Sequence, residues 1–398
     1  MQEYDTIVIG GGAAGICAAI SAARCGQKVI ICEKTGQIGK KVLATGNGRC
    51  NLLNETLNES YYNASSRELV KTVFNQFSKD QILKFFTDLG LHVYAKEGRI
   101  FPATNQASSV LKILDLELKR LAVPVQLEFD CGRLEFSSDS IQVMATDGKK
   151  LKGPKVILSG GGKTYPAYGA DGSAYSLAMK AGHKLIEPVP AVVPLLVKDQ
   201  LCVALQGQRI NASVRSFING EMGDSSEGEL LFTPYGLSGT CILDISEAIS
   251  IALNRKHLTD VNIEIDFIPF VTKNDLKAEL EKRQQADWAN SELLVGILTN
   301  KIAMTLKSLF EVGVNDSVVK ALKERRFKVS GTRGWNEAEF TSGGITVSEV
   351  KPTTLESKLR KGLYFAGEIL DVNGARGGYN LAWAWASGMV AGMGRKGE

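Results

Sequence analysis

The pattern of apolar and polar residues near the start of the chain predicts a strand, a helix and a second strand in succession. Residues 6–10 form a short apolar run, residues 14–25 are rich in alanine, and residues 28–32 are apolar again. Gly26 follows the alanine-rich segment, where glycine commonly ends a helix. These features are typical of a βαβ unit, so the first 34 residues predict the beginning of an α/β domain.

The pattern then predicts several helices and one further strand. Residues 67–89 are typical of two helices, and residues 107–121 of another. Apolar and polar positions alternate over residues 125–152, which predicts a small β-meander. Residues 155–158 predict a strand that runs into a stretch of three glycines.

Three prolines between residues 188 and 194 mark a crossing into a new domain. Residues 191–270 are strand-like, with turns predicted at "NGEMGDSSEGE" and "TPYGLSG", and residues 271–340 are predominantly helical. The last stretch again predicts strand, loop and helix. The simplest arrangement is one α/β domain made of residues 1–190 and 341–398, interrupted by a β-rich and then a helical insert.

Composition excludes several classes of protein. The chain has 398 residues, 44% hydrophobic and 23% charged, which is ordinary for a globular protein. The net charge of +4 suits an anionic ligand but does not indicate nucleic-acid binding by itself. The seven cysteines are scattered and form no C-x-x-C pair, which favours neither a metal site nor a disulfide framework. Neither a signal peptide nor a membrane span is predicted, so we expect a cytoplasmic protein.

The first candidate site is the glycine motif Gly10-x-Gly12-x-x-Gly15, which lies between the first strand and its helix. Such a turn brings a pyrophosphate to the free N–H groups and positive end of the helix. Glu33 ends the second strand, where a carboxylate accepts hydrogen bonds from an adenosine ribose. The motif therefore predicts FAD or NAD rather than NADP, although a glycine turn without a ligand remains an alternative.

The organisation of the chain helps to decide between a flavin that stays bound and a nicotinamide that binds and leaves. Both chain ends belong to the predicted α/β domain, which favours a cofactor that stays bound. The later Gly160, Gly161 and Gly162 follow a strand but lack the fingerprint spacing and the downstream acid. No separate nicotinamide domain is predicted.

The second candidate site is "LATGNGRCNLLN", residues 43–54. Gly46, Asn47 and Gly48 accept positive φ angles, and their N–H groups suit an anion. We expect Arg49 to pair with a phosphate or a substrate carboxylate and to lower the pKa of Cys50. The alternative is a solvated loop with a buried cysteine.

The third candidate site is "LYFAGEILDVNGARGGYNLAWAWASGMVAG" near the end of the chain. Glu368 and Asp371 follow a predicted strand, where acids can hold ribityl hydroxyls. Gly377 and Gly378 precede a helix whose N-terminus would stabilise negative charge on a reduced flavin. The two tryptophans of that helix are interpreted as packing residues.

Seven motifs occur in order along nearly the whole chain. They are "GGGAAG", "KKVLATGNGRCNLLN", "GRIFPATNQASSVL", "ILSGGGKTYPAYGADGSAYSLAMKAGH", "FTPYGLSGTCILDIS", "FTSGGITVSEVKPTTLESK" and the C-terminal stretch quoted above. Through these motifs the chain resembles the BaiN-type family of bacterial NAD(P)/FAD-dependent oxidoreductases, which is related to the fumarate reductase and succinate dehydrogenase flavoproteins. The resemblance implies a Rossmann-like FAD-binding domain with an inserted β-barrel (191–270) and a small helical subdomain (271–340).

The resemblance also implies which residues hold a non-covalent FAD. The residues expected to bind the pyrophosphate are Gly10, Gly12, Ala13, Ala14 and Gly15. Those expected at the adenosine are Glu33, Lys34 and Cys131. Those expected to close over the cofactor are Ser159, Gly160 and Gly161. The residues along the flavin are Lys41, Thr45, Gly46, Asn47, Gly48, Arg49 and Asn51. The residues expected to hold the ribityl chain and the flavin ring are Gly367, Glu368, Asp371, Gly378, Tyr379, Asn380 and Leu381.

No serine–histidine or histidine–aspartate pair is visible, and no histidine lies in a glycine motif, so covalent flavin attachment is not expected. Arg376 departs from the family pattern, and it either brings positive charge near the ring or faces solvent. The candidate catalytic residues are Arg49, Cys50, Tyr165, Arg376 and Tyr379.

Three functions follow as hypotheses. The main one is an oxidoreductase in which NAD(P)H reduces FAD, which then reduces an activated C=C bond in a small, apolar substrate. A second is an RNA-acting or RNA-binding flavoprotein, motivated by the basic cluster between residues 323 and 333. That cluster is better interpreted as a solvated helix end, so nucleic acid is the less favoured partner. A third is a flavin-binding protein without turnover.

Overall fold

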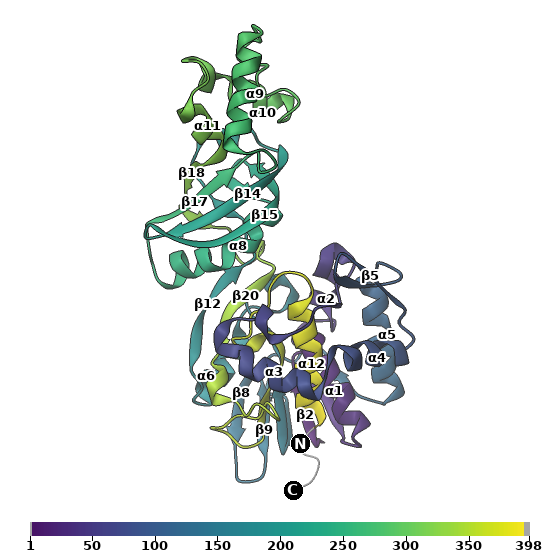
Figure 1. Cartoon of the computed structure of the whole chain (residues 1–398). Coiled ribbons are helices and arrows are strands. Elements are labelled where there is room, and N and C mark those ends of the chain that lie inside the picture. The colour runs from purple at the N-terminus through teal and green to yellow at the C-terminus, as the bar shows by residue number, and fades with distance from the viewer. Residues whose placement is uncertain (1, 394–398) are drawn as a thin grey trace. The chain divides into compact units, whose positions relative to one another are not determined.

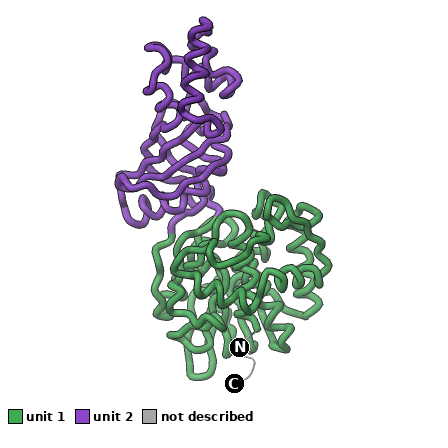
Figure 2. The backbone as a smooth tube through the Cα atoms, viewed as in Figure 1, with its two compact units in different colours: residues 1–188, 340–398 green, residues 189–339 purple. Residues whose placement is uncertain are grey.

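The computed structural model describes residues 2–393 and divides into two compact units. Unit 1 combines residues 1–188 with 340–398, and unit 2 comprises residues 189–339 (Figure 2). The α/β class predicted from the sequence is confirmed. Both chain ends lie in unit 1, which holds every residue assigned above to the cofactor.

A five-stranded parallel sheet forms the centre of unit 1. One of its strands, β2, is labelled in Figure 1. Its strand order is β21-β11-β2-β3-β7, so the C-terminal strand pairs beside the strand that precedes the three glycines. The strands are β2 (Thr6–Ile9), β3 (Val29–Cys32), β7 (Val125–Gln126), β11 (Lys155–Leu158) and β21 (Leu363–Phe365). Each residue of β2, β3, β11 and β21 is buried, as continuous apolar runs in a covered parallel sheet require.

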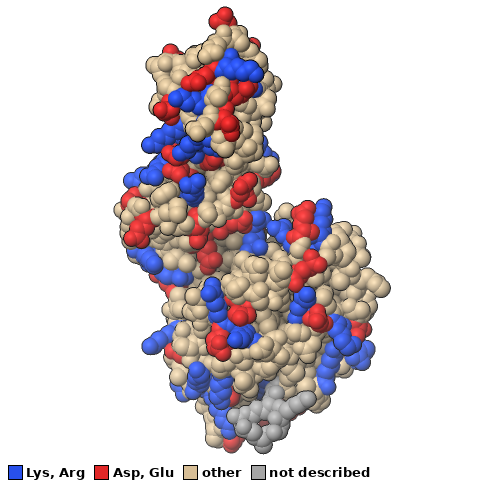
Figure 3. Space-filling model, viewed as in Figure 1, with Lys and Arg blue, Asp and Glu red and all other residues tan. Residues whose placement is uncertain are grey.

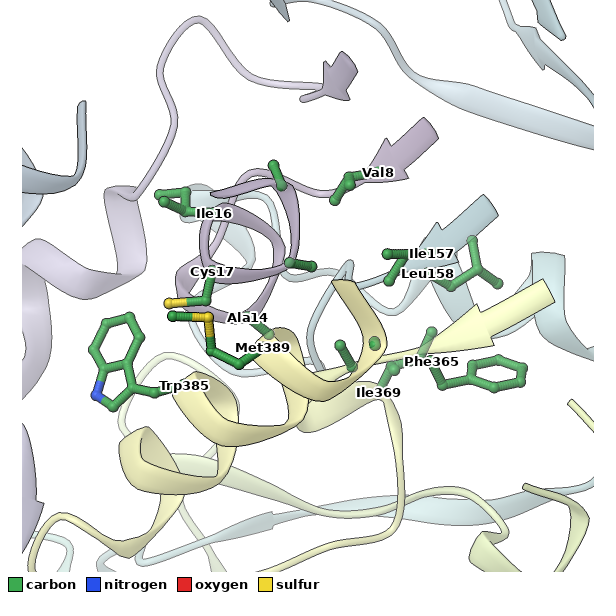
Figure 4. Packing of buried hydrophobic residues seen from close by; sticks show 14 of the residues in the cluster. Val8, Ala14, Ile16, Cys17, Ile157, Leu158, Phe365, Ile369, Trp385 and Met389 are labelled. Carbon is green, nitrogen blue, oxygen red and sulfur yellow. The ribbon is translucent and has the colours of Figure 1, made fainter. Parts of the chain in front are cut away.

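Helix α1 (Ala13–Arg24) packs against helix α12 (Tyr379–Met393), and glycines allow the close approach. A Cβ atom at Gly388 would lie 2.3 Å from the carbonyl oxygen of Ala14, and one at Gly392 would lie 2.3 Å from that of Ala18. Figure 4 shows Met389 beside Cys17 in the core between the helices. This contact brings the helix after the first glycine motif against the helix after the last one.

Smaller elements complete unit 1. The predicted meander is the sheet β1-β10-β9-β8, and a second small sheet has the order β4-β6-β5. The strands of these sheets are β1 (Gln2–Glu3), β8 (Cys131–Phe136), β9 (Ile141–Ala145), β10 (Lys150–Gly153), β4 (Leu53–Asn54), β5 (Val93–Lys96) and β6 (Arg99–Pro102). The helices are α2 (Lys40–Ala44), α3 (Arg67–Gln76), α4 (Lys79–Asp88), α5 (Ala107–Arg120) and α6 (Ser173–Lys180). Strands β12 (Leu185–Ala191) and β20 (Phe340–Ile345) pair with each other.

Unit 2 contains a seven-stranded sheet of order β18-β17-β14-β15-β16-β13-β19, with its own apolar core. Its strands are β13 (Leu195–Leu196), β14 (Arg209–Ile218), β15 (Glu221–Thr233), β16 (Gly236–Ser238), β17 (Val261–Asp266), β18 (Arg325–Lys328) and β19 (Gly331–Thr332). Its helices are α7 (Gln200–Ala204), α8 (Thr240–Ser250), α9 (Lys273–Gln285), α10 (Asn300–Thr305) and α11 (Asp316–Lys323). A closed barrel and a separate helical subdomain remain predictions.

Two local predictions in unit 2 were wrong. Residues 240–250 form a helix within the stretch interpreted as strand-like, because Ile242, Ile245 and Ile249 recur at helical spacing and are fully or almost fully buried. The segment "NGEMGDSSEGE" turns only at Asn219 and Gly220, after which β15 begins. Pairing with β14 supplies the hydrogen bonds that outweigh its poor strand composition.

Candidate functional site

The first glycine motif forms an open cradle at the start of α1. Gly10 has a φ of 102°, and a Cβ there would lie 2.6 Å from the carbonyl oxygen of Ser159. A Cβ at Gly15 would lie 1.9 Å from the carbonyl oxygen of Gly10, so the helix packs directly on the turn. At Gly12 a Cβ would meet nothing within 4 Å, and no side chain caps the helix. The free N–H groups from Ala13 onward thus face an open space suited to a phosphate.

Glu33 lies next to this cradle, at the end of β3. Its side-chain oxygens accept hydrogen bonds from the backbone N–H groups of Gly11 and Thr35, both at 2.8 Å. Only 8% of Glu33 is exposed. These two bonds fix the carboxylate and leave lone pairs for further donors such as ribose hydroxyls. Lys34 instead pairs with Asp171, 2.6 Å from Nζ to Oδ1.

Ser159 contacts the glycine turn, and the segment before Cys131 contacts Glu33. The Ser159 hydroxyl lies 2.9 Å from the carbonyl oxygen of Gly10, to which it donates. The backbone N–H of Phe129 donates to the carbonyl oxygen of Glu33, so the segment that leads to Cys131 runs beside β3. Burial raises the pKa of Cys131 to about 12, which leaves its thiol uncharged at neutral pH. A contact through its backbone, as predicted, needs no thiolate.

Lys41 and Glu368 meet in an ion pair, 2.5 Å from Nζ to Oε2, although 327 positions separate them in the chain. The Lys41 ammonium group also contacts the Thr164 hydroxyl at 2.5 Å. The other Glu368 oxygen accepts hydrogen bonds from the Thr164 hydroxyl at 3.3 Å and from the backbone N–H of Thr341 at 2.8 Å. A Cβ at Gly161 would lie 3.9 Å from Glu368 Oε2. Neither threonine was predicted from the sequence, although Thr164 follows Gly162 by two residues and Thr341 precedes Gly343 by two.

The "TGNGRCN" loop has the backbone geometry that its glycines predict. Gly46, Asn47, Gly48 and Cys50 have φ values of 57°, 54°, 82° and 59°. The Arg49 side chain is exposed, and its Nε donates to the carbonyl oxygen of Gly46 at 3.3 Å. The Thr45 hydroxyl donates to the carbonyl oxygen of Val42 at 2.6 Å, which closes the start of the loop.

The prediction that Arg49 lowers the pKa of Cys50 was wrong. Cys50 is completely buried, and burial raises the pKa of its thiol to about 12. The arginine is exposed and donates to the loop backbone, so its charge is solvated. Cys50 is therefore a neutral thiol within the core.

The turn before α12 packs tightly on the segment after the "TGNGRCN" loop. Gly377 and Gly378 have φ values of 130° and 104°. A Cβ at Gly378 would lie 2.9 Å from Asn51 Oδ1 and 2.7 Å from the backbone of Leu53. The side-chain amide of Asn54 donates to the carbonyl oxygen of Gly377 at 3.1 Å. Only glycine allows this approach, so the turn positions the N-terminus of α12 beside Asn51.

The first residues of α12 are held by their own side chains. Tyr379 is 4% exposed, stacks on Tyr61 with ring centroids 4.4 Å apart, and has its hydroxyl 3.2 Å from Thr56 Oγ1. Burial raises the pKa of Tyr379, so its hydroxyl stays protonated. The side chain of Asn380 bonds both the N–H and the carbonyl oxygen of Gly374, and the side chain of Leu381 packs on the core.

Two candidate catalytic residues occupy different surroundings. Tyr165 follows Thr164 on the Lys41 side, has a φ of 57°, and stacks on Tyr168 with centroids 5.6 Å apart. Arg376 is half-buried in the turn before α12. Arg49 and Cys50 lie in the loop whose continuation packs on that turn, so the turn and the loop form one region of the site.

Three buried polar atoms around these motifs have no hydrogen-bond partner among residues 2–393. They are Asn51 Oδ1, Tyr175 Oη and Asn373 Oδ1. Burial raises the pKa of the Tyr175 hydroxyl, and the negative charges of Glu368 and Asp371 raise it further. Buried polar atoms are normally satisfied, and a bound polar cofactor would provide partners for these three. FAD fits this set of residues because the glycine cradle, the fixed carboxylate and the unsatisfied atoms match its phosphate, ribose and flavin parts.

Comparisons with known proteins decide the family. The model of the HI0933-like protein Rossmann domain matches residues 4–394. The chain belongs to the HI0933-like family. It is 37% identical over 402 residues to the 3-dehydro-bile acid delta(4,6)-reductase of Clostridium scindens, with 97% of each chain covered. It is 28% identical over 408 residues to the ribosomal RNA dihydrouridine synthase of Haemophilus influenzae, again with 97% of each covered.

The same fold occurs in a solved structure of the open conformation of a flavocytochrome c3 fumarate reductase. The TM-score is 0.52 at 15% identity, covering 98% of this chain and 78% of the other. The resemblance to the BaiN-type family is thus confirmed, and this member of the HI0933-like family is a flavoprotein oxidoreductase. Within residues 2–393, no helix has the length and apolar character needed to cross a membrane. The same residues contain no cluster of acids, histidines and cysteines that would hold a metal.

Proposed function

We propose that the protein binds FAD non-covalently, takes a hydride from NAD(P)H, and passes it to a C=C bond conjugated to a carbonyl group. The observation that carries the proposal is the 37% identity, over 97% of both chains, to a reductase named for a 3-dehydro bile acid with unsaturation at positions 4 and 6. A 3-keto group conjugated to such double bonds is an activated alkene. The proposed substrate is accordingly a small, largely apolar molecule.

The residues have distinct tasks in this proposal. The N-terminus of α1 would bind the pyrophosphate, and Glu33 would accept hydrogen bonds from the ribose. Lys41 and Glu368 would hold the ribityl chain and ring through the network that they form with Thr164. The N-terminus of α12 would stabilise negative charge at the pyrimidine side of the ring. When bound, FAD supplies a two-electron carrier that accepts and donates hydride.

Reduction of an activated alkene also requires a proton donor. Tyr379 and Tyr165 carry hydroxyl groups, and the raised pKa of Tyr379 keeps that group protonated at neutral pH. Cys50 is an uncharged thiol because burial raises its pKa to about 12. We favour a tyrosine as the donor and assign Cys50 to packing, because it is completely buried.

A second candidate function is reduction of uridine within RNA, favoured by the 28% identity to a ribosomal RNA dihydrouridine synthase. Dihydrouridine forms by reduction of a ring C=C bond that is conjugated to a carbonyl, so the reaction class is the same. The two candidates differ in the molecule that carries the alkene.

The charges of unit 2 favour the small molecule. Lys323 is buried and pairs with Asp266 at 2.7 Å, and Arg326 pairs with Glu264 at 3.1 Å. Arg333 also has an acidic neighbour in Glu337. On the face shown in Figure 3, Lys and Arg are interspersed with Asp and Glu. Nucleic-acid backbones instead select clusters of unpaired positive charge.

The test is an anaerobic titration of the purified holoprotein. Yellow protein should lose its visible absorbance when NADH or NADPH is added. The reduced protein should recover its colour with a 3-oxo-Δ4 steroid acid but not with an unmodified uridine-containing ribosomal RNA. Recovery with the RNA alone would favour the second candidate. Bleaching without recovery by any acceptor, and without steady-state NAD(P)H consumption, would leave a flavin-binding protein without turnover.

A further inference from the structure

The small sheet β4-β6-β5 carries positive charge on one face. In its antiparallel register Arg99 is paired with Lys96 on one side and with Asn54 on the other, while Phe101 is paired with Tyr94. Directly paired residues project from the same face of a sheet, and residues two apart on a strand do so as well. All five side chains therefore share one face, which we call the β6 face.

The opposite side of β6 belongs to the core. Ile100 is paired with Leu53, and these side chains are 6% and 0% exposed. The apolar side fixes the register, because a shift of one residue would turn Arg99 inward and expose Ile100. The charged side chains are consequently held on the β6 face by the same contacts that stabilise the sheet.

The β6 face adjoins the turn that leads into α12. The Nε atom of Arg99 lies 3.8 Å from the position of a Cβ at Gly377, and Asn54 donates to the carbonyl oxygen of the same glycine. Arg49 lies over the Phe101 ring, with its Cζ 5.4 Å from the centroid. Arg99 thus borders the turn proposed to hold the flavin ring, and Arg49, from a different segment, lies over Phe101 of the same strand.

No acidic side chain balances this charge. Lys96 lies directly opposite Arg99, and like charges in that position repel. Among residues 2–393 neither forms an ion pair, and Glu97 in the intervening turn forms none either. The polar contact of Arg49 is to a backbone carbonyl, which leaves its terminal nitrogens available. An anion bound between these cations would relieve the repulsion.

We propose that Arg99, together with Arg49, binds a carboxylate on the substrate and orients the substrate at the ring. This rests on the proposed function and adds to it the residues that hold the acid group of the substrate. A guanidinium is suited to the task because its planar donors match a carboxylate. A single anionic group fits better than an RNA strand, since Phe101 is 7% exposed beneath Arg49 and is not free to stack on a base.

The experiment measures binding to the oxidised holoprotein through the flavin difference spectrum, without turnover. The probes are a 3-oxo-Δ4 bile acid, its methyl ester, and a short oligouridine. The variants are Arg99→Gln, Arg99→Lys, and Arg133→Gln as a control that removes an exposed arginine of β8. Flavin content and melting temperature establish that each variant is folded.

The proposal predicts that Arg99→Gln weakens binding of the acid by roughly tenfold to a hundredfold and leaves the ester within about twofold. Arg99→Lys should fall between wild type and Arg99→Gln for the acid, and Arg133→Gln should match wild type. Equal weakening of acid and ester would overturn the proposal, because it would indicate a structural role. Unchanged acid binding would also overturn it, as would an effect on oligouridine alone. Since the readout is binding, it is independent of whether NAD(P)H reduces the flavin.

Discussion

The two ends of the proposed FAD site are built in different ways. The adenosine end comes mainly from one segment, residues 7–34, in which the glycine turn, the helix and Glu33 follow one another along the chain. The ring end combines segments that are far apart, as the ion pair between Lys41 and Glu368 illustrates. A local motif can be identified from its spacing, whereas an assembled site depends on how the sheet orders its strands. The two ends should therefore respond differently to substitution.

The largest effect is expected at the glycine turn. Gly15→Val should prevent α1 from packing on Gly10 and cost about 3 kcal/mol or more, because the clash is with backbone. The variant should contain little FAD and melt at a much lower temperature. Gly12→Ala is the matched variant, since its Cβ meets open space. It should keep the stability of the apoprotein and lose FAD affinity. Equal melting temperatures for the two apoproteins would contradict this account of the turn.

Glu33→Gln tests the adenosine end with almost no change in side-chain size. The amide retains an acceptor for one backbone N–H but loses the charge, so FAD affinity should fall by roughly tenfold to a hundredfold. The absorption spectrum of the FAD that still binds should be unchanged, because Glu33 is assigned to the ribose. Fluorescence titration of the apoprotein measures the affinity, with Glu68→Gln in α3 as control. A shifted flavin spectrum would place Glu33 near the ring instead.

Substitutions of Lys41 and Glu368 test the ring end of the proposed FAD site. Lys41→Met and Glu368→Gln should each shift the spectrum of bound FAD and lower stability by about 1 kcal/mol, since the pair is partly exposed. The double variant should cost less than the sum, with a coupling of about 0.5–1 kcal/mol. Denaturant unfolding of all four proteins measures the coupling. Strict additivity would show that the pair does not contribute as a unit.

The smallest effect on stability is expected at a buried histidine that lies outside both ends of the proposed FAD site. His183 is 4% exposed, with Nδ1 3.1 Å from Glu349 Oε2 and Nε2 2.7 Å from Ser357 Oγ. Ser357 Oγ also accepts hydrogen bonds from the N–H groups of Leu359 and Arg360, so this group secures a loop.

Burial lowers the pKa of His183, so the unfolded chain binds a proton at a higher pH than the folded chain does. Stability should therefore be complete above about pH 6.5 and decrease as the pH falls through the lowered pKa. His183→Gln should reduce this dependence between pH 7 and 5, while His92→Gln, at an exposed site, should retain it. Denaturant unfolding at several pH values measures it. Stability that rises on acidification would contradict the sign.

The sequence predicted the parallel βαβ start, the helices α3, α4 and α5, and the final strand, loop and helix, because each has a clear apolar period or glycine boundary. It predicted no helix at α2, which lies in a stretch rich in glycine and asparagine. It did not predict α8, because isoleucine is common in strands. In the structure the isoleucines of α8 are buried at helical spacing. Thr164 and Thr341 were overlooked because each gains its role only when β11, β20 and the segment after β21 come together. Arg99 lay within a quoted motif, but only the pairing of β6 reveals its neighbours. The direction of the Cys50 pKa shift was predicted wrongly for a similar reason, because the burial of a side chain cannot be inferred from the spacing of a sequence motif.

The central claim is that this flavoprotein transfers hydride to a conjugated alkene. The most direct measurement is a single turnover with photoreduced holoprotein, mixed anaerobically with a 3-oxo-Δ4 steroid acid or with its saturated counterpart. The account predicts that flavin absorbance returns only with the unsaturated compound, with one alkene reduced for each flavin oxidised. A flavin that stays reduced with both compounds, and with other conjugated ketones, would contradict it.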